Sequence, residues 1–542
     1  MYKFIITSLL LGFGVLQAGQ KPNIVFIFSD DHAFQSIGVY ATDLKGIAQT
    51  PNIDRIGNQG IIFDRAYVTN SICGPSRATV LTGKHSHKNG YVDHDSPWNQ
   101  EQVTFPKLLQ AGGYQTAIIG KLHLANKISG FDYVEIMPGL GKYYNPEFIK
   151  NGELIKYTGY CTDIITDRAI WWMDEGRDKN KPFMAFVNYK AVHSEFEPAL
   201  RHLNAFDDAY IPVPATLFDD MRNRKALSLA EVRILEHMGF ERMAVEPPPE
   251  MNEEQKATWH KAFDAKNKEF LESGATGDKL ILLKYKRFMQ NYLATVLAMD
   301  EGIGRILDYL DANNLSENTL VIYSSDQGFF IGEHGIYDKR FMYEESFRTP
   351  LLMSMPSKIK AGTRTDRLAQ NLDFAQTILD VAGIESPKEM QGRSLVPLFK
   401  DPNTDDWRKS LYYHYWAGGN DIHTVCRHDG VITQEGEKLI DFYLLGEKEY
   451  YDLREDKLEI FNKYAAPEKA ERVAAMQKEL ERLREFYDVP AEDSNQLQYA
   501  KAFLKKINVK APAYIEKQPD VQLKKFGRWP STIEEYLKTK NK

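Results

Sequence analysis

Apolar, β-branched runs separated by helix-favouring stretches constrain the fold of this 542-residue chain more than any other feature. The clearest runs are Asn23 to Phe28, Ala117 to Ile119, Phe183 to Tyr189 and Leu320 to Tyr323. Helix-like stretches such as Tyr292 to Leu310 lie between them. The alternation predicts an α/β fold in which helices sandwich a large mixed, mostly parallel sheet.

Each of these runs is followed directly by polar side chains that can do chemistry. In chain order they are Asp30 and Asp31, Lys121 and His123, Lys190 and His193, and Asp326 and Gln327. Any one pair could be a solvated turn. Because parallel sheets place ligands at the carboxyl ends of their strands, the convergence of all these pairs predicts an active site at that edge.

Two changes in sequence character divide the chain. From 215 to 278 the sequence is charged and helix-favouring, which predicts a helical insertion in a catalytic domain of residues 20–400. A substrate role and a solvated decoration both remain open for this insertion. The turn-rich stretch 401–406 then predicts the start of a smaller C-terminal α+β subdomain with an antiparallel sheet and a tail, residues 401–542.

Within the C-terminal subdomain the pattern predicts strands, one helix and a tail. The strands are Leu411 to Trp416, Lys438 to Leu445 and Tyr450 to Leu453, and the amphipathic helix runs from Pro467 to Phe486. Lys and Arg outnumber acidic residues after Lys501, which is typical of a solvated tail.

The N-terminal residues 1–19 resemble a secretory signal peptide. Lys3 precedes an apolar run from Phe4 to Val15, and Leu16 to Gly19 offers small residues for cleavage. The apolar run is short for a membrane span, so we expect a periplasmic or secreted protein without stable membrane insertion. An uncleaved anchor or a buried first strand is less favoured, because a separate strand-like run begins at Asn23.

Charge and cysteine content exclude several classes of protein. The net charge is -7 with both signs interspersed, so we expect no nucleic-acid partner. Three cysteines, Cys73, Cys161 and Cys426, are too few for a disulfide framework. Cys161 and Cys426 could pair, which leaves Cys73 over.

Cys73 opens the most informative motif of the chain. Pro75 favours a helix start and Gly83 a helix stop, so Cys73 lies at the N-terminus of a short predicted helix. The helix dipole favours anions there, and Arg77 shares the face of Cys73 four residues on. From these residues alone, a reactive cysteine and a structural cysteine are equally favoured.

Together Cys73, Pro75, Arg77, Thr82 and Gly83 resemble the signature of the formylglycine-dependent (type I) sulfatases of the alkaline phosphatase superfamily. The resemblance extends over nearly the whole chain after the signal, and it is closest to bacterial carbohydrate sulfatases. It includes Pro22 to Val25, Ser29 to Asp31, Gly120 to Leu124, Thr162 and Asp163, Ser325 to Gly328, Gly332 to Gly335 with Lys339, and Tyr451 to Leu453. The resemblance implies an alkaline phosphatase-like fold.

The resemblance also implies two cofactors. In the family a separate maturation enzyme oxidises the signature cysteine, here Cys73, to formylglycine (3-oxoalanine), which also contacts the metal. Asp30, Asp31 and Asp326 offer hard carboxylate oxygens and Gln327 an amide oxygen, a set that suits calcium or magnesium better than zinc. The family favours calcium, and many members have Asn at the position of Gln327.

The catalytic roles follow from the same resemblance. Arg77, Lys121 and Lys339 would hold the sulfate together with the metal. One hydroxyl of the hydrated aldehyde would attack sulfur, and His193 would protonate the leaving oxygen, with Lys339 assisting. His123 would orient the second hydroxyl, whose deprotonation releases sulfate.

Substrate contacts are predicted from the smaller domain, which closes one side of the pocket in related sulfatases. The candidates are Arg427, His428 and Asp429 and the aromatic residues Tyr413, Tyr415 and Trp416. The aromatic residues fit core packing equally well. We interpret His85, His87 and His94 as ordinary histidines, and leave open whether His334 shapes a loop or lies near substrate.

The function indicated is hydrolysis of a sulfate ester on a carbohydrate, with glycosaminoglycan fragments and algal galactans as the main candidates. One alternative is a phosphonate or phosphate ester hydrolase of the same superfamily. The other is a non-catalytic protein that binds sulfated glycans and keeps the thiol of Cys73. The sequence determines neither the sugar nor the sulfated carbon.

Overall fold

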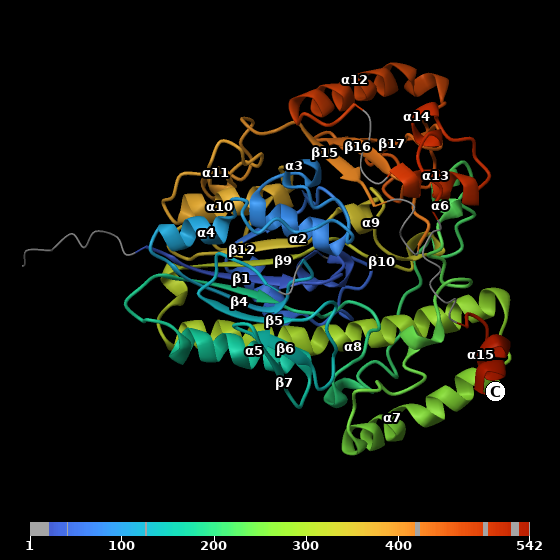
Figure 1. Ribbon diagram of the computed structural model, residues 1–542. Helices are drawn as coiled ribbons and strands as arrows, with labels where there is room; N and C mark the ends of the chain where they lie inside the picture. The colour runs from blue at the N-terminus through green and yellow to red at the C-terminus, as the bar shows by residue number, and fades with distance from the viewer. Residues whose placement is uncertain are drawn as a thin grey trace, which may run out of the picture.

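The computed structural model describes residues 21–40, 42–124, 127–417, 423–491, 497–521 and 530–540. The predicted signal peptide, residues 1–19, lies outside this range. The core is a mixed, mostly parallel sheet of order β13-β2-β12-β9-β1-β8-β4-β5-β6-β7 (Figure 1). The predicted fold class is confirmed.

The predicted strand runs form the centre of this sheet as four parallel neighbours in the order β9-β1-β8-β4. They are β1 (Asn23–Ser29), β4 (Gln115–Lys121), β8 (Phe183–Asn188) and β9 (Thr319–Ser325). Ser29 pairs with Ser325, and Asn188 pairs with both Phe28 and Gly120. The polar residues that follow these strands therefore emerge at one edge.

Helices bury both faces of the sheet, which explains why β1 is continuously apolar. Val25 and Ile27 point into one core cluster, whereas Ile24, Phe26 and Phe28 point into the other. Figure 1 shows α2, α4 and α10 over one face and α5 and α8 over the opposite face. The main helices are α1 (Pro51–Asn58), α2 (Cys73–Thr82), α4 (Phe105–Ala111), α5 (Cys161–Trp171), α8 (Gly277–Ala312), α10 (Phe374–Val381) and α11 (Val396–Lys400).

The remaining strands extend the sheet on both sides. They are β2 (Ile61–Phe63), β12 (Leu351–Ser354) and β13 (Thr363–Thr365) on one side and β5 (Tyr133–Met137), β6 (Glu147–Lys150) and β7 (Glu153–Lys156) on the other. The hairpin of β10 (Phe330–Ile331) and β11 (Tyr337–Asp338) lies between β9 and Lys339.

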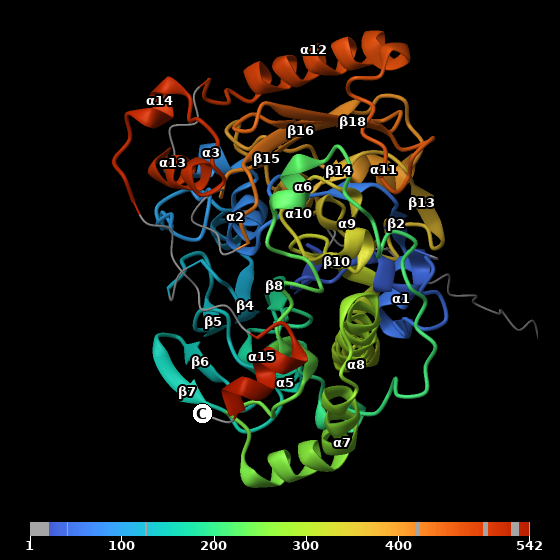
Figure 2. The same ribbon diagram turned by 90° about the vertical axis from the view of Figure 1, so that its right-hand side faces the viewer.

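The smaller C-terminal sheet is antiparallel with four strands, and helix α12 (Ala470–Phe486) packs on it (Figure 2). Three strands were predicted: β15 (Ser410–Tyr415), β17 (Glu437–Phe442) and β18 (Glu447–Asp452). The fourth, β16 (His428–Thr433), was not, because it begins with three polar or small residues that read as a turn.

The predicted insertion, 215–278, is helical only in part. It contains α6 (Lys225–Leu229), the short η5 (Phe240–Met243) and α7 (Glu253–Glu272), with turns before α7. It is more than a solvated decoration, because Ile234 N donates to Gly335 O and Tyr337 N donates to Val232 O. These bonds attach the insertion to the β10–β11 hairpin.

The prediction of a solvated tail after Lys501 is wrong. Helices α13 (Leu497–Lys506) and α14 (Ala513–Glu516) bury Phe503, Leu504 and Ile515 in the core of the C-terminal subdomain. Helix α15 (Ile533–Lys540) packs Ile533 and Tyr536 into the core beside α8. The sequence pattern did not indicate these helices because each is short and buries only a few apolar residues.

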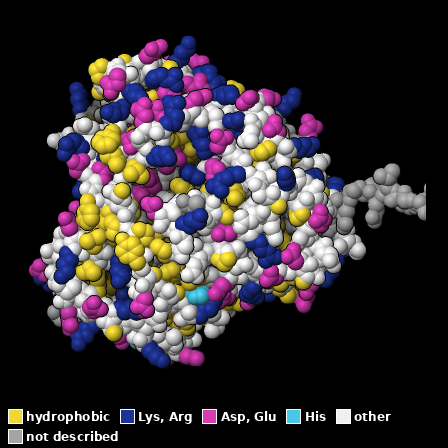
Figure 3. All heavy atoms as spheres, turned by 180° about the vertical axis from the view of Figure 1, so that it is seen from behind, with side chains coloured by type: hydrophobic (Ala, Val, Ile, Leu, Met, Phe, Trp, Pro, Cys, Tyr) yellow, Lys and Arg dark blue, Asp and Glu magenta, His cyan; other side chains and the backbone are white. Residues whose placement is uncertain are grey.

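The surface is chemically mixed. On the face shown in Figure 3, basic and acidic side chains intermingle, and hydrophobic side chains gather towards one side. No helix of the described residues has the length and apolar character needed to cross a membrane.

Candidate active site

Three buried carboxylates meet where β1 and β9 end. Asp30 and Asp31 follow β1, Asp326 follows β9, and one oxygen from each lies within 4.8 Å of the others. Asp31 adopts a left-handed backbone (φ 61°), and its N–H donates to Asp326 Oδ1 at 3.1 Å. The register of the two strands therefore creates the cluster.

Three cations face these carboxylates. Lys121 Nζ contacts Asp30, and Lys339 Nζ lies 2.7 Å from both oxygens of Asp31. Arg77 donates from Nε to Asp326 Oδ2 at 3.0 Å. Burial would raise the pKa of Asp30, but Lys121 and the other cations hold it well below its usual range. The cluster is thus balanced in charge as well as buried.

Arg77 also connects the strand ends to one another. Its Nη1 donates to Lys121 O at 3.0 Å and to Asn188 Oδ1 at 3.1 Å. Because Asn188 ends β8, one guanidinium bridges the ends of β4, β8 and β9. Asn188 was not among the predicted site residues.

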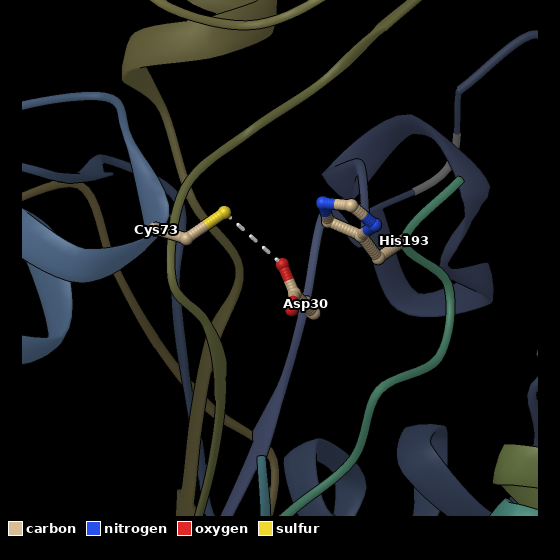
Figure 4. Close-up of side chains that lie close together, drawn as sticks. All are labelled: Asp30, Cys73 and His193. Atoms are coloured by element: carbon tan, nitrogen blue, oxygen red, sulfur yellow. Dashed lines mark hydrogen bonds between the residues drawn. The ribbon is translucent and has the colours of Figure 1, made fainter. Parts of the chain in front are cut away.

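Cys73 lies at the N-terminus of α2, as predicted, and is 1% exposed. Its Sγ is 3.4 Å from Asp30 Oδ1, and Figure 4 shows Cys73 and His193 on opposite sides of that carboxylate. Burial, followed by the charge of Asp30, raises the pKa of the thiol. A helix N-terminus tends to lower the pKa of a thiol, but burial outweighs that effect here. Unmodified Cys73 is therefore a poor thiolate nucleophile.

His193 follows β8 and faces the carboxylates. Its Nδ1 lies 2.8 Å from Ser194 O, which fixes Nδ1 as a donor and directs Nε2 to within 3.9 Å of Asp31 Oδ2. Burial and the charge of Lys121 lower the pKa of the imidazole. A bound anion would oppose this effect.

His123 comes two residues after the end of β4 and lies beside His94. The two rings are 4.5 Å apart, and His94 Nε2 accepts a hydrogen bond from Gly74 N at 3.4 Å. Burial and Lys121 lower the pKa of His123. His94 was interpreted as an ordinary histidine, and the sequence contains no signal of its position because its loop, not a strand, brings it to the site.

The donor set suits a hard divalent cation. Gln327 Nε2 donates to Asp31 Oδ1 at 2.5 Å and to Asp326 Oδ1 at 2.7 Å, whereas Gln327 Oε1 is buried and has no hydrogen-bond partner in the part of the chain that the structure describes. Rotating this amide by half a turn exchanges the two atoms and directs Oε1 at the carboxylates, which a cation there would favour. Three carboxylates and an amide oxygen fit calcium or magnesium.

A cavity of about 870 Å³ opens above this cluster. Its floor includes Asp31, Cys73, His123, His193 and Lys339. The walls contain Lys190, which the strand-end pattern had placed at this edge, and charged residues that were not predicted as site residues, among them Asp93, Arg242, Asp338, Arg340 and His423. Asp338 and Arg340 flank Lys339 in sequence, which was the available signal; Arg242 belongs to the insertion and had none.

The structure corrects the predicted substrate contacts. His428 is fully buried among the rings of Phe341, Tyr413, Tyr415 and Phe442. Asp429 pairs with Arg484 at 2.6 Å and is 2% exposed. Both belong to β16, and they stabilise the C-terminal sheet rather than line the cavity.

Arg427 is also buried and does not line the cavity. It does act on the cavity residue Asp93: burial raises the pKa of Asp93, and the charge of Arg427 partly opposes that rise. Tyr413 and Tyr415 lie in the core, in agreement with the packing interpretation. His334 is fully buried and lies 2.6 Å from Asp219, so it shapes its loop. Cys161 and Cys426 are both free and lie in different core clusters.

Comparison with known proteins gives consistent matches. A sulfatase family model matches residues 22–384, and a model of the C-terminal part of N-sulphoglucosamine sulphohydrolase matches residues 332–486. The N-acetylglucosamine-6-O-sulfatase of Bacteroides thetaiotaomicron is 44% identical over 489 residues, 86% of each chain. The human N-acetylglucosamine-6-sulfatase is 26% identical over 76% of this chain and 70% of its own.

Solved structures agree. A protein in complex with its substrate, D-glucosamine-2-N,6-O-disulfate, is 43% identical and has a TM-score of 0.83, covering 88% of this chain and 100% of that chain. The phosphonate monoester hydrolase of Agrobacterium radiobacter, at 18% identity, has a TM-score of 0.67 over 86% of this chain and 96% of its own. The second likeness shows the shared fold alone.

Proposed function

Because this chain belongs to the sulfatase family and is a sulfuric ester hydrolase, we propose that it removes the 6-O-sulfate of glucosamine residues in glycosaminoglycan fragments. The observation that supports this best is the floor of the cavity. Cys73, Asp31 and Lys339 line it, and directly beneath them two further carboxylates and two further cations complete the cluster that sulfate ester chemistry requires. The choice of sugar rests on the relative with 44% identity, which is named for this chemistry, and on the structure with 43% identity, whose substrate is a glucosamine with a 6-O-sulfate.

The proposal includes two groups beyond the chain itself. Formylglycine, made from Cys73 by a maturation enzyme, supplies a hydroxyl nucleophile in its hydrated form. Calcium held by Asp30, Asp31, Asp326, Gln327 and residue 73 supplies positive charge for the sulfate oxygens. The raised pKa of the Cys73 thiol supports the need for conversion, since the unmodified side chain is protonated at neutral pH.

The side chains of the site then have separate tasks. Asp30, 3.4 Å from the side chain of residue 73, accepts the proton of the nucleophile. Arg77, Lys121 and Lys339 neutralise the nonbridging sulfate oxygens. His193, with Nε2 facing the cluster, delivers a proton to the departing sugar oxygen once the anionic substrate raises its pKa.

His123 lines the cavity with His193 and takes the proton whose loss completes turnover. Its buried Nδ1 has no partner among the described residues, and its lowered pKa keeps the ring neutral and able to accept.

Release of inorganic sulfate from matched sugars tests the proposal. The panel is N-acetylglucosamine-6-sulfate, glucosamine-2-N,6-O-disulfate, the 3-O-sulfated isomer, galactose-6-sulfate and N-acetylglucosamine-6-phosphate. The protein is produced with a maturation enzyme, the aldehyde at residue 73 is verified by peptide mass, and Cys73→Ala is the control. We expect release from the two 6-sulfated glucosamines only.

Two results would redirect the assignment. Release from galactose-6-sulfate alone would point to a galactan substrate, and faster release of phosphate than of sulfate would favour the phosphate ester alternative. Silence with a confirmed aldehyde would contradict the glucosamine assignment.

We also propose a periplasmic or secreted location, supported by the signal-like residues 1–19. N-terminal sequencing of protein from the exported fraction is expected to begin near Gln20. A mature chain that still begins at Met1 would contradict cleavage.

A further inference from the structure

Lys190 is a buried cation on the wall of the cavity. It follows β8, is 3% exposed and lines the cavity three residues before His193. Among the described residues its one hydrogen bond, to Ser194 O, is long at 3.4 Å. Its other contact is the ring of Tyr143, whose centroid lies 4.8 Å from Nζ. The ammonium therefore has most of its hydrogen-bonding capacity unused.

The other buried lysines are fully engaged. Lys121 and Lys339 contact Asp30 and Asp31, and Lys438 pairs with Glu344 at 2.9 Å and Glu459 at 2.8 Å. Lys284 donates to three carbonyls at 2.7 to 3.1 Å. Within the part of the chain that the structure describes, Lys190 alone among the buried lysines has neither a carboxylate in ion-pair distance nor a set of carbonyls.

An incompletely paired buried cation costs stability. Desolvation disfavours the charged form and the neighbouring Lys121 repels it, so burial first and Lys121 second lower the pKa of Lys190, although the charge of Glu195 opposes them. Removing this charge should leave the fold as stable as before or more so. Glu195 acts on Lys190 without an ion pair among the described residues, so a buried ammonium that faces a cavity points to a ligand that brings an anion within hydrogen-bond distance.

Tyr143 holds Lys190 and His193 in one arrangement. Its OH donates to His193 O at 2.7 Å while its ring faces Lys190 Nζ. The ammonium is therefore positioned on the side of the cavity from which His193 approaches the carboxylates.

We propose that Lys190 is a substrate-binding residue whose ammonium takes an oxygen of an anionic sulfo group of the sugar, an inference that rests on the proposed function. The sulfo group has two sources on a glucosamine substrate: the ester that is hydrolysed, and a second sulfo group on the amine. Both present the same tetrahedral anion, and a charge-assisted hydrogen bond would form with either.

Substitution by Met, which keeps the length of the side chain, tests the proposal. For K190M we expect KM to rise about ten- to a hundred-fold, as for loss of a charge-assisted hydrogen bond, with a smaller change in kcat. We expect its Tm to equal or exceed that of the wild type. K190R should recover much of the affinity, whereas K284M should lower Tm because it leaves three carbonyls without a donor.

Three arms identify the source of the anion. A KM change confined to glucosamine-2-N,6-O-disulfate assigns Lys190 to the second sulfo group. An equal change with N-acetylglucosamine-6-sulfate, together with weaker binding of inorganic sulfate, assigns it to the ester. Sulfate binding is measured by calorimetry on protein that keeps Cys73 unmodified, so this arm does not depend on turnover.

The proposal is overturned if K190M lowers Tm while KM and sulfate binding stay unchanged, because Lys190 would then be structural. If the wild type releases sulfate from neither sugar, the proposed function fails. Lys190 is then judged by sulfate binding alone: weaker binding in K190M supports a role in anion binding, and equal binding overturns it.

Discussion

Some side chains of the active site act through their charge, and others are held by hydrogen bonds in one orientation. Asp30 contacts Lys121 and lies 3.4 Å from the side chain of Cys73, so it can respond to both the nucleophile and the cations. His193 is held through Nδ1 and leaves Nε2 to act. Exchanging one such residue should therefore change one property of the reaction, which permits sharp tests.

His193→Ala should affect substrates according to their leaving groups. Sugar alkoxides need a proton to depart, so we expect kcat/KM for N-acetylglucosamine-6-sulfate to fall about 10²- to 10⁴-fold. Aryl sulfates, whose phenolate leaves without protonation, should lose far less. Steady-state rates on both esters check this, and equal losses would argue against His193 as the acid.

Gln327→Leu should weaken calcium binding by about tenfold or more, because it removes an oxygen donor and leaves the neighbouring carboxylates less well oriented. The measurement is Tm as a function of calcium concentration. Gln327→Asn is the matched control, since it keeps an amide oxygen and should bind calcium more tightly than the Leu variant. Identical titration curves for all forms would exclude Gln327 as a ligand.

The residues with a chemical signature could be predicted from the sequence. Cys73, Arg77 and Asp326 lie together because their motifs follow strands or open a helix, and local pattern determines that placement. The strand-end pattern placed Lys190 at this edge, but its burial and sparse pairing needed the tertiary structure. The position of His94 also needed it, because a histidine in a loop is usually solvated. His428 and Asp429 were misassigned because the strand that buries them, β16, was not predicted.

Among the elements, β4 shows how tightly the strand ends are packed. Gly120 precedes Lys121 with φ +106°, and a Cβ there would lie 1.8 Å from Asn188 O on β8. Only glycine can adopt this conformation at so close an approach, and it determines where Lys121 leaves the strand.

Gly120→Ala should therefore destabilise the protein by more than about 2 kcal/mol and reduce turnover. Gly113→Ala is the matched control, because Gly113 also has a positive φ (+87°) but open space around its Cβ position. That control should cost only about 1 kcal/mol. Urea denaturation gives both values, and equal costs would show that the contact with Asn188 is relieved without penalty.

Strand β16 and helix α12 are joined by the ion pair of Asp429 with Arg484. Arg484→Met leaves the Asp429 carboxylate buried, and we expect a loss of about 2 to 3 kcal/mol, less than for a fully buried pair because Arg484 is 33% exposed. Burial already raises the pKa of Asp429. Without Arg484 the pKa of Asp429 rises further. At pH values between its pKa in the unfolded state and this raised pKa, Asp429 is protonated in the folded state but ionised in the unfolded state.

The variant should accordingly lose more stability at pH 8 than at pH 5, since protonation of Asp429 relieves the buried charge. Thermal unfolding at the two pH values measures this, with Arg482→Met as the exposed control on the same helix. KM should stay unchanged; a rise in KM would restore Asp429 as a substrate contact.

Across the whole molecule, the C-terminal segment returns from the smaller subdomain to the catalytic domain. Tyr536 of α15 packs on Phe240 with ring centroids 5.1 Å apart, and its OH donates to Glu246 Oε1 at 2.5 Å. Arg242, two residues after Phe240, lines the cavity. Helix α15 thus supports a segment that borders the cavity, and no local pattern could predict this contact because only two apolar positions of α15 are buried.

Tyr536→Ala should lower the free energy of unfolding by about 2 to 3 kcal/mol and raise KM, because η5 and Arg242 lose their support. Tyr536→Phe, which keeps the ring and loses one hydrogen bond, should cost about 1 kcal/mol. Calorimetric unfolding and steady-state kinetics test both. An unchanged Tm in the Ala variant would mean that α15 does not stabilise the insertion.

The central sheet joins segments that are far apart in the sequence, so it cannot form until the ribosome has made the later segment. Helix α2 is held against the sheet partly through Ser76, whose Oγ donates to Asp326 O across 250 residues of chain. At about 5 to 20 residues per second, a ribosome needs about 12 to 50 s to extend the chain from one to the other. During that interval the contact between Ser76 and Asp326 cannot form, so the enclosure that leaves Cys73 only 1% exposed is incomplete. The maturation enzyme of the proposed function would therefore reach the thiol in this interval, before folding encloses it.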